Sequence, residues 1–140
     1  MTAITEPQVR EMIAVVNSRN VDKVLDQYAE DATFQSPAEE RPVQGKAAIR
    51  TVLTEAYTAF PDWTIEPKVI SVIGNEVLIV NSVRGTHDGP LTGPAGKSFP
   101  ATHRKFTQEQ MTRVVLNEKG KVQSLRAYGN PAELFHQLGL

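Results

Sequence analysis

The segment Val83-Arg84-Gly85-Thr86-His87-Asp88-Gly89-Pro90 decides the fold, because it lies at the centre of a stretch in which apolar and polar residues alternate. The alternation runs from Val69 to Tyr128, and its period of two is typical of strands with a covered face. One face of the central strand carries Val77, Ile79, Asn81, Val83, Gly85 and His87, and the other carries Leu78, Val80, Ser82, Arg84 and Thr86. Because both faces are partly apolar where the strand begins, we expect it to be central and covered on both sides. The polar residues on the first face predict a lined cavity rather than a solid core.

Three segments before this stretch have the spacing of amphipathic helices. The first begins at Thr5, which can cap it in a capping box with Gln8. The second begins at Asn20 and runs through Tyr28, and the third starts at Gly45 and is ended by a proline after Phe60. We therefore expect three helices to precede most of the sheet.

Strands are expected at residues 32–37, 63–73, 76–87, 102–116 and 121–128, with loops at 38–44 and 88–100 and a short last helix after Asn130. Helices followed by strands that are joined mainly by hairpins predict an α+β fold. We expect a curved antiparallel sheet, covered by three N-terminal helices and closed by a short C-terminal helix. Such a sheet forms a cone whose open end is a natural pocket, within a single domain spanning residues 1–140.

The composition excludes several classes of function. A formal net charge of -1 with mixed signs gives no basic field for nucleic acid. The chain has no Cys, which excludes disulfides, thiol nucleophiles and Cys-ligated zinc. We find no signal peptide and no apolar run long enough to span a membrane, so we expect a cytoplasmic protein without a membrane partner. His87 and His103 lack a third partner at metal-ligand spacing, so we expect no metal and no cofactor.

Several short motifs, in this order and spacing, resemble one family of cone-shaped folds. They are Ala59-Phe60-Pro61-Asp62-Trp63, Gly85-Thr86-His87-Asp88-Gly89, the Gly/Pro loop through Gly96-Lys97, Glu118-Lys119-Gly120-Lys121-Val122, and Gly129-Asn130-Pro131 leading to Leu134-Phe135-His136-Gln137-Leu138-Gly139. Over nearly its whole length the chain is similar to the SnoaL-like polyketide cyclase or ester cyclase group of the nuclear-transport-factor-2-like superfamily.

The resemblance implies a ring closure by an intramolecular aldol reaction, with a carboxylate as acid and base and no metal. The family commonly places an Asp just before the final helix, and Asn130 stands at that position here. Asn has no titratable carboxylate and cannot abstract a proton as Asp does. The usual tryptophan a few positions earlier is replaced by Arg126.

The candidate catalytic residues are His87, Asp88 and Asn130. A neutral imidazole at the mouth of a cavity can relay a proton or orient a carbonyl group. The alternative for His87 is a strand-end side chain that hydrogen-bonds a loop. His103 is a candidate for substrate binding if it neighbours His87, and the favoured alternative is a solvated strand start.

The remaining candidates for substrate binding are aromatic or polar. Phe34, Tyr57, Phe60 and Trp63 are expected in the core or the pocket wall. Polar side chains also occupy every second position of the last two strands. They are expected to line a wet cavity, or to face solvent or a second subunit, and the candidates among them are Gln110, Arg126 and Tyr128. Asp62, which follows a proline, is expected to be structural.

Three hypotheses about function follow. The first is a small-molecule enzyme that cyclises or isomerises an apolar oxygenated substrate, in which His87 moves the proton and Asn130 holds an enolate oxygen. The second is a non-catalytic protein that binds a small ligand and has lost the base. The third, an epoxide-opening hydrolase, requires two carboxylates beside an arginine such as Arg126. The resemblance also implies a homodimer formed through the outer face of the sheet, since members of this family commonly dimerise there.

Overall fold

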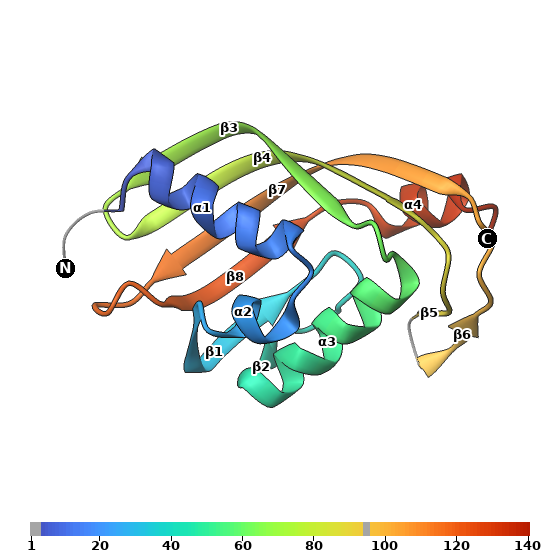
Figure 1. Cartoon of the computed structure of the whole chain (residues 1–140), viewed down its shortest axis with the longest axis horizontal. Coiled ribbons are helices and arrows are strands. Elements are labelled where there is room, and N and C mark those ends of the chain that lie inside the picture. Colours follow the sequence, from blue (N-terminus) through green and yellow to red (C-terminus); the bar gives the residue numbers. More distant parts are fainter. Residues whose placement is uncertain (1–3, 94–95) are drawn as a thin grey trace.

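The structure, a computed structural model, describes residues 4–93 and 96–140. Within these ranges six strands form a sheet of order β2-β1-β8-β7-β4-β3 (Figure 1). They are β1 (Tyr28–Gln35), β2 (Val43–Gln44), β3 (Thr64–Ile73), β4 (Glu76–Thr86), β7 (Lys105–Leu116) and β8 (Val122–Tyr128). A separate pair of short strands consists of β5 (Leu91–Thr92) and β6 (Ser98–Phe99).

The helices are α1 (Glu6–Asn17), α2 (Val21–Leu25), α3 (Lys46–Ala59) and α4 (Pro131–Gln137). The first three cover one side of the sheet, and α4 lies at its far end beside β7 (Figure 1). The caps expected from the sequence are present. Thr5 and Gln8 form the capping box of α1, and Asn20 caps α2 by accepting from the N–H of Lys23. The α+β architecture with three N-terminal helices and a short C-terminal helix is therefore confirmed.

The strand register decides which residues face the helices. Asn81 pairs with Gln110, and Thr112 pairs with Ala127, so these residues share the concave face beneath the helices. Along β4 every second residue from Val77 to Gly85 is buried, whereas the residues between them are more exposed. The expected alternation is correct, but the outer face of β4 is only half-buried, because no described helix crosses it.

The structure differs from the expectation in several places, and three short strands, β2, β5 and β6, lie in segments expected to be loops. The sheet is mixed rather than antiparallel, because β1 runs parallel to β8 with Phe34 opposite Leu125. Tyr28 begins β1 instead of ending the second helix, since its side chain packs into the core below α1. The long strand starts at Lys105 rather than at residue 102, because His103 has a positive φ of 61° that breaks the extended backbone.

Two clusters of buried side chains make up the core. The larger cluster lies between α1, α2, α3 and the sheet and includes Val9, Ile13, Leu53 and Val114. The smaller cluster lies at the far end and contains Ala59, Phe60, Val83, Phe106 and Leu138. Ile65 packs against both clusters and so joins them.

The segment after β4 folds back over the smaller cluster. The N–H groups of Asp88 and Gly89 both donate to the carbonyl of Ala59 at the end of α3. Gly89 lies so close to that helix that an added Cβ would stand 2.0 Å from the carbonyl oxygen of Thr58. The backbone approach requires glycine here, and it fixes where the loop that carries β5 and β6 begins.

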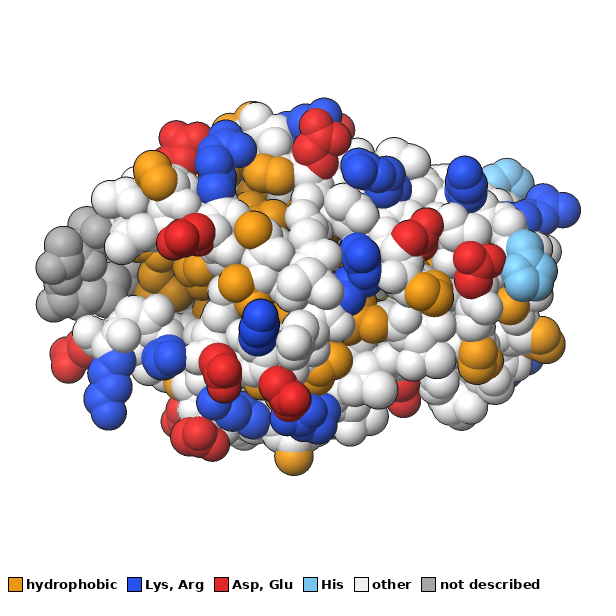
Figure 2. Space-filling model, in the orientation of Figure 1, with side chains coloured by type: hydrophobic (Ala, Val, Ile, Leu, Met, Phe, Trp, Pro, Cys, Tyr) orange, Lys and Arg blue, Asp and Glu red, His pale blue; other side chains and the backbone are white. Residues whose placement is uncertain are grey.

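Charged side chains of both signs are interspersed over the face shown in Figure 2. The helices of residues 4–93 and 96–140 are too short or too polar to cross a membrane.

Candidate functional site

A cavity of about 70 Å³ lies against the concave face of the sheet beneath α1. Its lining is almost entirely apolar and consists of Val9, Met12, Ile13, Val16, Gln27, Tyr28, Ile65, Val77, Ile79, Val114, Val122 and Leu125. The described wall carries two polar side chains, Gln27 and Tyr28. The cavity is therefore suited to an apolar body with few hydrogen-bonding groups.

A row of neutral polar side chains continues the concave face beyond this cavity. Asn81 donates from Nδ2 to the hydroxyl of Thr112 at 3.0 Å. Gln110 donates to Oε1 of Gln108 at 2.9 Å, and Gln108 donates to the carbonyl of Asn130 at 2.8 Å. Asn81 is 2% exposed, and its Oδ1 has no hydrogen-bond partner among the described residues. A buried carbonyl oxygen without a partner is unfavourable by about 1–3 kcal/mol.

Two tyrosines lie at the helix side of the interior. Tyr57 donates its hydroxyl to the carbonyl of Val16 at 3.0 Å, and burial raises its pKa to about 12. Burial also raises the pKa of Tyr28, which is 5% exposed. Both hydroxyls therefore remain protonated and act as hydrogen-bond donors at neutral pH.

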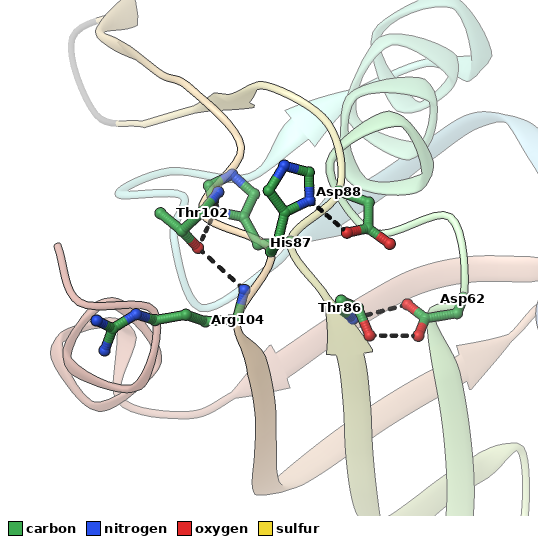
Figure 3. A network of polar contacts seen from close by, with 7 residues as sticks. Asp62, Thr86, His87, Asp88, Thr102 and Arg104 are labelled. Carbon is green, nitrogen blue, oxygen red and sulfur yellow. Dashed lines mark hydrogen bonds and ion pairs between the residues drawn. The ribbon is translucent and has the colours of Figure 1, made fainter.

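His87 is fully buried at the opposite end of the sheet, with its ring 5.7 Å from that of Phe60. Nδ1 lies 3.2 Å from the backbone nitrogen of Thr102 and 2.9 Å from the Thr102 hydroxyl (Figure 3). Because the backbone N–H can only donate, Nδ1 is the acceptor and the ring proton lies on Nε2. Nε2 has no hydrogen-bond partner among the described residues. Burial lowers the pKa of His87, and the nearby His103 lowers it further. The Gly89 backbone and the charge of Asp88 raise this pKa, but by less, so the ring is neutral.

Asp88 and His103 form a hydrogen-bonded pair on the surface next to His87. Nδ1 of His103 lies 2.9 Å from a carboxylate oxygen of Asp88, and the two side chains are 74% and 48% exposed (Figure 3). The backbone brings His103 beside His87, because the N–H of His103 donates to the carbonyl of His87. Both side chains nevertheless point to solvent, so the structure does not bring them into one site with the His87 ring.

Asp62 has the structural position expected for it. Its carboxylate accepts from the N–H and the hydroxyl of Thr86, each at 2.7 Å (Figure 3). Burial would raise the pKa of Asp62, but these hydrogen bonds outweigh it and the pKa is lowered. Asp62 thereby ties the turn after α3 to the end of β4.

Three candidates from the sequence lie away from the concave face. Arg126 pairs with Arg113 and Tyr128 with Met111, which places both on the outer face of the sheet. There the guanidinium of Arg126 stacks over the Tyr128 ring at 4.6 Å. Asn130 is exposed and caps α4, its side-chain oxygen accepting from the N–H of Ala132 at 2.9 Å.

The aromatic candidates divide between the two clusters. In the larger cluster the ring centroid of Phe34 lies 6.4 Å from that of Tyr28. In the smaller cluster the ring centroid of Trp63 lies 5.8 Å from those of Phe60 and Phe106. Tyr57 and Gln110 contribute to the concave side, as described above.

Several residues of the site were not identified from the sequence, among them Tyr28, Thr102, Phe106 and Gln108. Phe106 and Gln108 had a detectable signal, since they alternate with Gln110 on one face of the strand. Tyr28 was obscured by its helix-like spacing from Val24 and Leu25. Thr102 reaches His87 only through the fold of the loop, for which the sequence carries no signal.

The concave face has no buried carboxylate. The described residues include every Asp and Glu of the chain, and the buried polar side chains among them are Asn81, His87, Gln108 and Gln110. The two half-buried carboxylates are occupied elsewhere: Glu39 accepts from Ser36, and Glu76 pairs with Arg113 on the outer face. No three described His, Asp or Glu side chains gather into a set that could hold a metal ion. The interior therefore offers neutral donors and acceptors and no carboxylate base.

A model of the SnoaL-like domain family matches residues 9–125 of this chain. The comparison with curated proteins found no match.

Solved structures with the same fold have low sequence identity to this chain. A candidate SnoaL-like polyketide cyclase from Jannaschia sp. CCS1 is 15% identical, with a TM-score of 0.81 over 94% of this chain and 89% of its own. SalBIII, an epoxide hydrolase/cyclase-like enzyme in pyran ring formation in the polyether salinomycin, is 23% identical. The match has a TM-score of 0.74 and covers 91% of this chain and 92% of SalBIII. A protein with a ketosteroid-isomerase-like fold from Catenulispora acidiphila DSM 44928, in complex with trimethylamine, is 17% identical, and the match has a TM-score of 0.78 and covers 98% of this chain and 95% of that protein. At these identities the likeness establishes the fold alone.

Proposed function

Because the chain belongs to the SnoaL-like domain family, we propose that it binds a small, largely apolar, oxygen-bearing molecule on the concave side of the sheet without using a carboxylate base. The observation that carries this proposal is the composition of the interior. An apolar cavity lies beside a row of neutral amides and hydroxyls, and every carboxylate of the chain is elsewhere. This pattern supports the non-catalytic binding protein over a cyclase that depends on a carboxylate.

The unpaired amide oxygen of Asn81 supports the same conclusion. Folding leaves it without a partner at a cost that a solid apolar core would avoid. A ligand hydroxyl that reaches the polar row would supply the missing donor. Departures of this kind from optimal packing are expected at functional sites.

The proposal is tested by ligand binding in two steps. Native mass spectrometry of the gently purified protein, followed by denaturation, shows whether a small molecule co-purifies. Titration with 2-naphthol then gives the affinity, since this phenol loses its proton in the excited state in water but keeps it in an apolar site. We expect saturable binding with one site per chain and emission from the neutral phenol. Absence of both a co-purified molecule and saturable 2-naphthol binding would overturn the proposal.

A second candidate function is acid/base isomerisation or cyclisation at His87. It is favoured by the neutral, buried imidazole whose Nε2–H has no partner. Such a group can donate a hydrogen bond to a carbonyl or enolate oxygen, and it is not placed to act as a base through Nδ1, which Thr102 occupies. A turnover screen with carbonyl and ester substrates tests it. His87→Gln should lower turnover far more than binding, and equal turnover in both proteins would reject this role.

An epoxide-opening hydrolase has no support from the geometry, because Arg126 lies on the outer face and no carboxylate accompanies it in the interior.

We also propose that the outer face of the sheet forms a homodimer interface. It exposes Val69, Met111 and Tyr128 by 56%, 42% and 40%, on a face that no described helix covers. Exposed apolar side chains on one sheet face are typical of an association site. Light scattering should find a dimer, and Met111→Glu should shift it toward the monomer. A wild-type monomer at all accessible concentrations would contradict this proposal.

A further inference from the structure

The internal cavity is too small to hold a typical ligand by itself. Its volume is about 70 Å³. Ligand pockets usually measure about 300–1,000 Å³. If the concave face binds a small molecule, the site must extend beyond this cavity.

A second and larger hollow lies next to this cavity along α1. It has a volume of about 390 Å³ and lies between α1 and the turn that joins β7 and β8. Its lining is Ile4, Gln8, Glu11, Met12, Val15, Gln27, Leu116 and Gly120. Figure 2 shows hydrophobic side chains gathered in a hollow at the corresponding end of the molecule. The volume of this hollow, which we call the groove, falls within the range of ligand pockets.

Met12 and Gln27 line both the groove and the internal cavity, so together they form the wall between the two. The side chain of Gln27 is held by a hydrogen bond to the carbonyl of Met12 at 3.4 Å, which is long and therefore weak. The backbone of Gln27 is fixed, because its carbonyl accepts from the N–H of Val122 at 2.8 Å. Met side chains adapt easily to a new neighbour. The wall can thus open by side-chain rotation without a change in the backbone.

We propose that the groove and the cavity are the outer and inner parts of one binding site, and that Met12 and Gln27 are the partition a ligand displaces on entry. This inference rests on the proposed function and adds the route and the class of ligand. The ligand is neutral and elongated, with an apolar body and a hydrogen-bond acceptor at its inner end.

The two ends of the site determine this class of ligand. At the inner end Tyr28 lines the cavity, and its protonated hydroxyl forms no hydrogen bond with a described residue, so it can donate to a carbonyl or hydroxyl oxygen. At the outer end Gln8 and Glu11 line the groove, and the carboxylate of Glu11 disfavours an anionic ligand. Val15 and Leu116 supply apolar contact between the ends.

Stopped-flow and equilibrium titrations with 2-naphthol test the route. Met12→Trp fills the partition and Val15→Trp fills the groove alone, so both should slow association at least about tenfold, and Met12→Trp should also weaken binding by at least about tenfold. Ala14→Trp is the matched control, because Ala14 is exposed on the same helix and lines neither space. It should bind within about twofold of the wild type. Tyr28→Phe should weaken binding by about threefold to tenfold through loss of the donor.

The result that overturns the inference is a wild-type protein that binds 2-naphthol while Met12→Trp and Val15→Trp bind it at unchanged rate and affinity. If the wild type binds neither 2-naphthol nor a co-purified molecule, the proposed function is overturned instead, so the two failures are distinguishable. Circular dichroism and the melting temperature verify the fold of each variant. Met12→Phe, which is smaller, replaces Met12→Trp if the latter does not fold, and the same slowing of association is then required.

Discussion

Replacement of Asn81 by Leu should stabilise the protein. Leu has the closest apolar shape to Asn, so the substitution removes the unpaired Oδ1 and keeps the branch of the side chain. Removal of that oxygen relieves a cost of about 1–3 kcal/mol, and the loss of the 3.0 Å hydrogen bond to Thr112 offsets about 1 kcal/mol. The two methyl groups gain a further small amount from burial, which the tighter fit partly cancels.

The net gain in the free energy of unfolding should be about 1–2 kcal/mol, which raises the melting temperature by roughly 3–8 °C for a chain of this size. With the amide of Asn81 turned by about 180°, its nitrogen rather than its oxygen would lack a partner, and the same gain would be expected. Chemical denaturation with urea and calorimetry measure the change. The matched control is Ser82→Val, which lies on the outer face of the same strand and should change stability by less than about 0.5 kcal/mol.

Thr112→Val provides the complementary perturbation. It removes the acceptor and leaves the Asn81 amide with no partner at all, so it should destabilise the fold by about 1–3 kcal/mol. In the double variant with Asn81→Leu this penalty should largely vanish, because no amide remains to be satisfied. An Asn81→Leu protein less stable than the wild type would refute the reasoning, since it would mean that buried water already satisfies Oδ1.

Three further predictions concern the loop, the pH dependence and the last helix. Gly89→Ala should destabilise the fold by more than about 3 kcal/mol, because its Cβ would stand 2.0 Å from the Thr58 carbonyl oxygen. Gly74 has open space around it and a φ of 62°, so Gly74→Ala should destabilise the fold by only about 1–2 kcal/mol. Similar urea midpoints for the two variants would contradict this prediction. The pKa of His87 is lowered in the folded protein, so near this pKa the unfolded chain binds more protons than the folded one. The contribution of His87 to the free energy of unfolding is therefore complete above about pH 6.5, and it falls as the pH drops from that value toward the folded pKa. The slope is at most about 1.4 kcal/mol per pH unit. His87→Gln should flatten that part of the stability curve, and parallel curves for His87→Gln and wild type would exclude the assignment. Asn130→Ala should lose about 1 kcal/mol as the cap of α4 is removed, and Asn130→Asp should keep the cap and gain up to about 1 kcal/mol from the helix dipole; measurable cyclase activity in Asn130→Asp would instead place this residue in an active site.

The sequence predicted the fold well because its strands follow a strict period of two. The alternation along Val77, Ile79, Asn81 and Val83 named the concave face correctly, and the caps at Thr5 and Asn20 began the expected helices. The parallel pairing of β1 with β8 was missed, because strand direction depends on how distant segments meet and not on local pattern.

The site was harder to predict than the fold. The same alternation that places Gln110 inward places Met111 outward, yet a register shift between Val115 and Leu116 changes which residues of β8 face inward. For Arg126 and Tyr128 the sequence leaves open a wet cavity, solvent or a second subunit, and the structure places both on the outer face. His87 was found because it ends a regular strand, but its partner Thr102 lies across a loop whose path depends on the approach of Gly89 to α3.

The parallel pair of β1 and β8 also has a consequence for the order of folding. β1 lies early in the chain and β8 is the last strand, so the early strand cannot acquire this neighbour until almost all of the chain has been synthesised. The α1, α2 and β1 region must wait with its apolar side chains uncovered, while the hairpins of β3, β4, β7 and β8 can form between sequence neighbours. On the ribosome the sheet should therefore assemble from its C-terminal meander, and the N-terminal segment should close the core last.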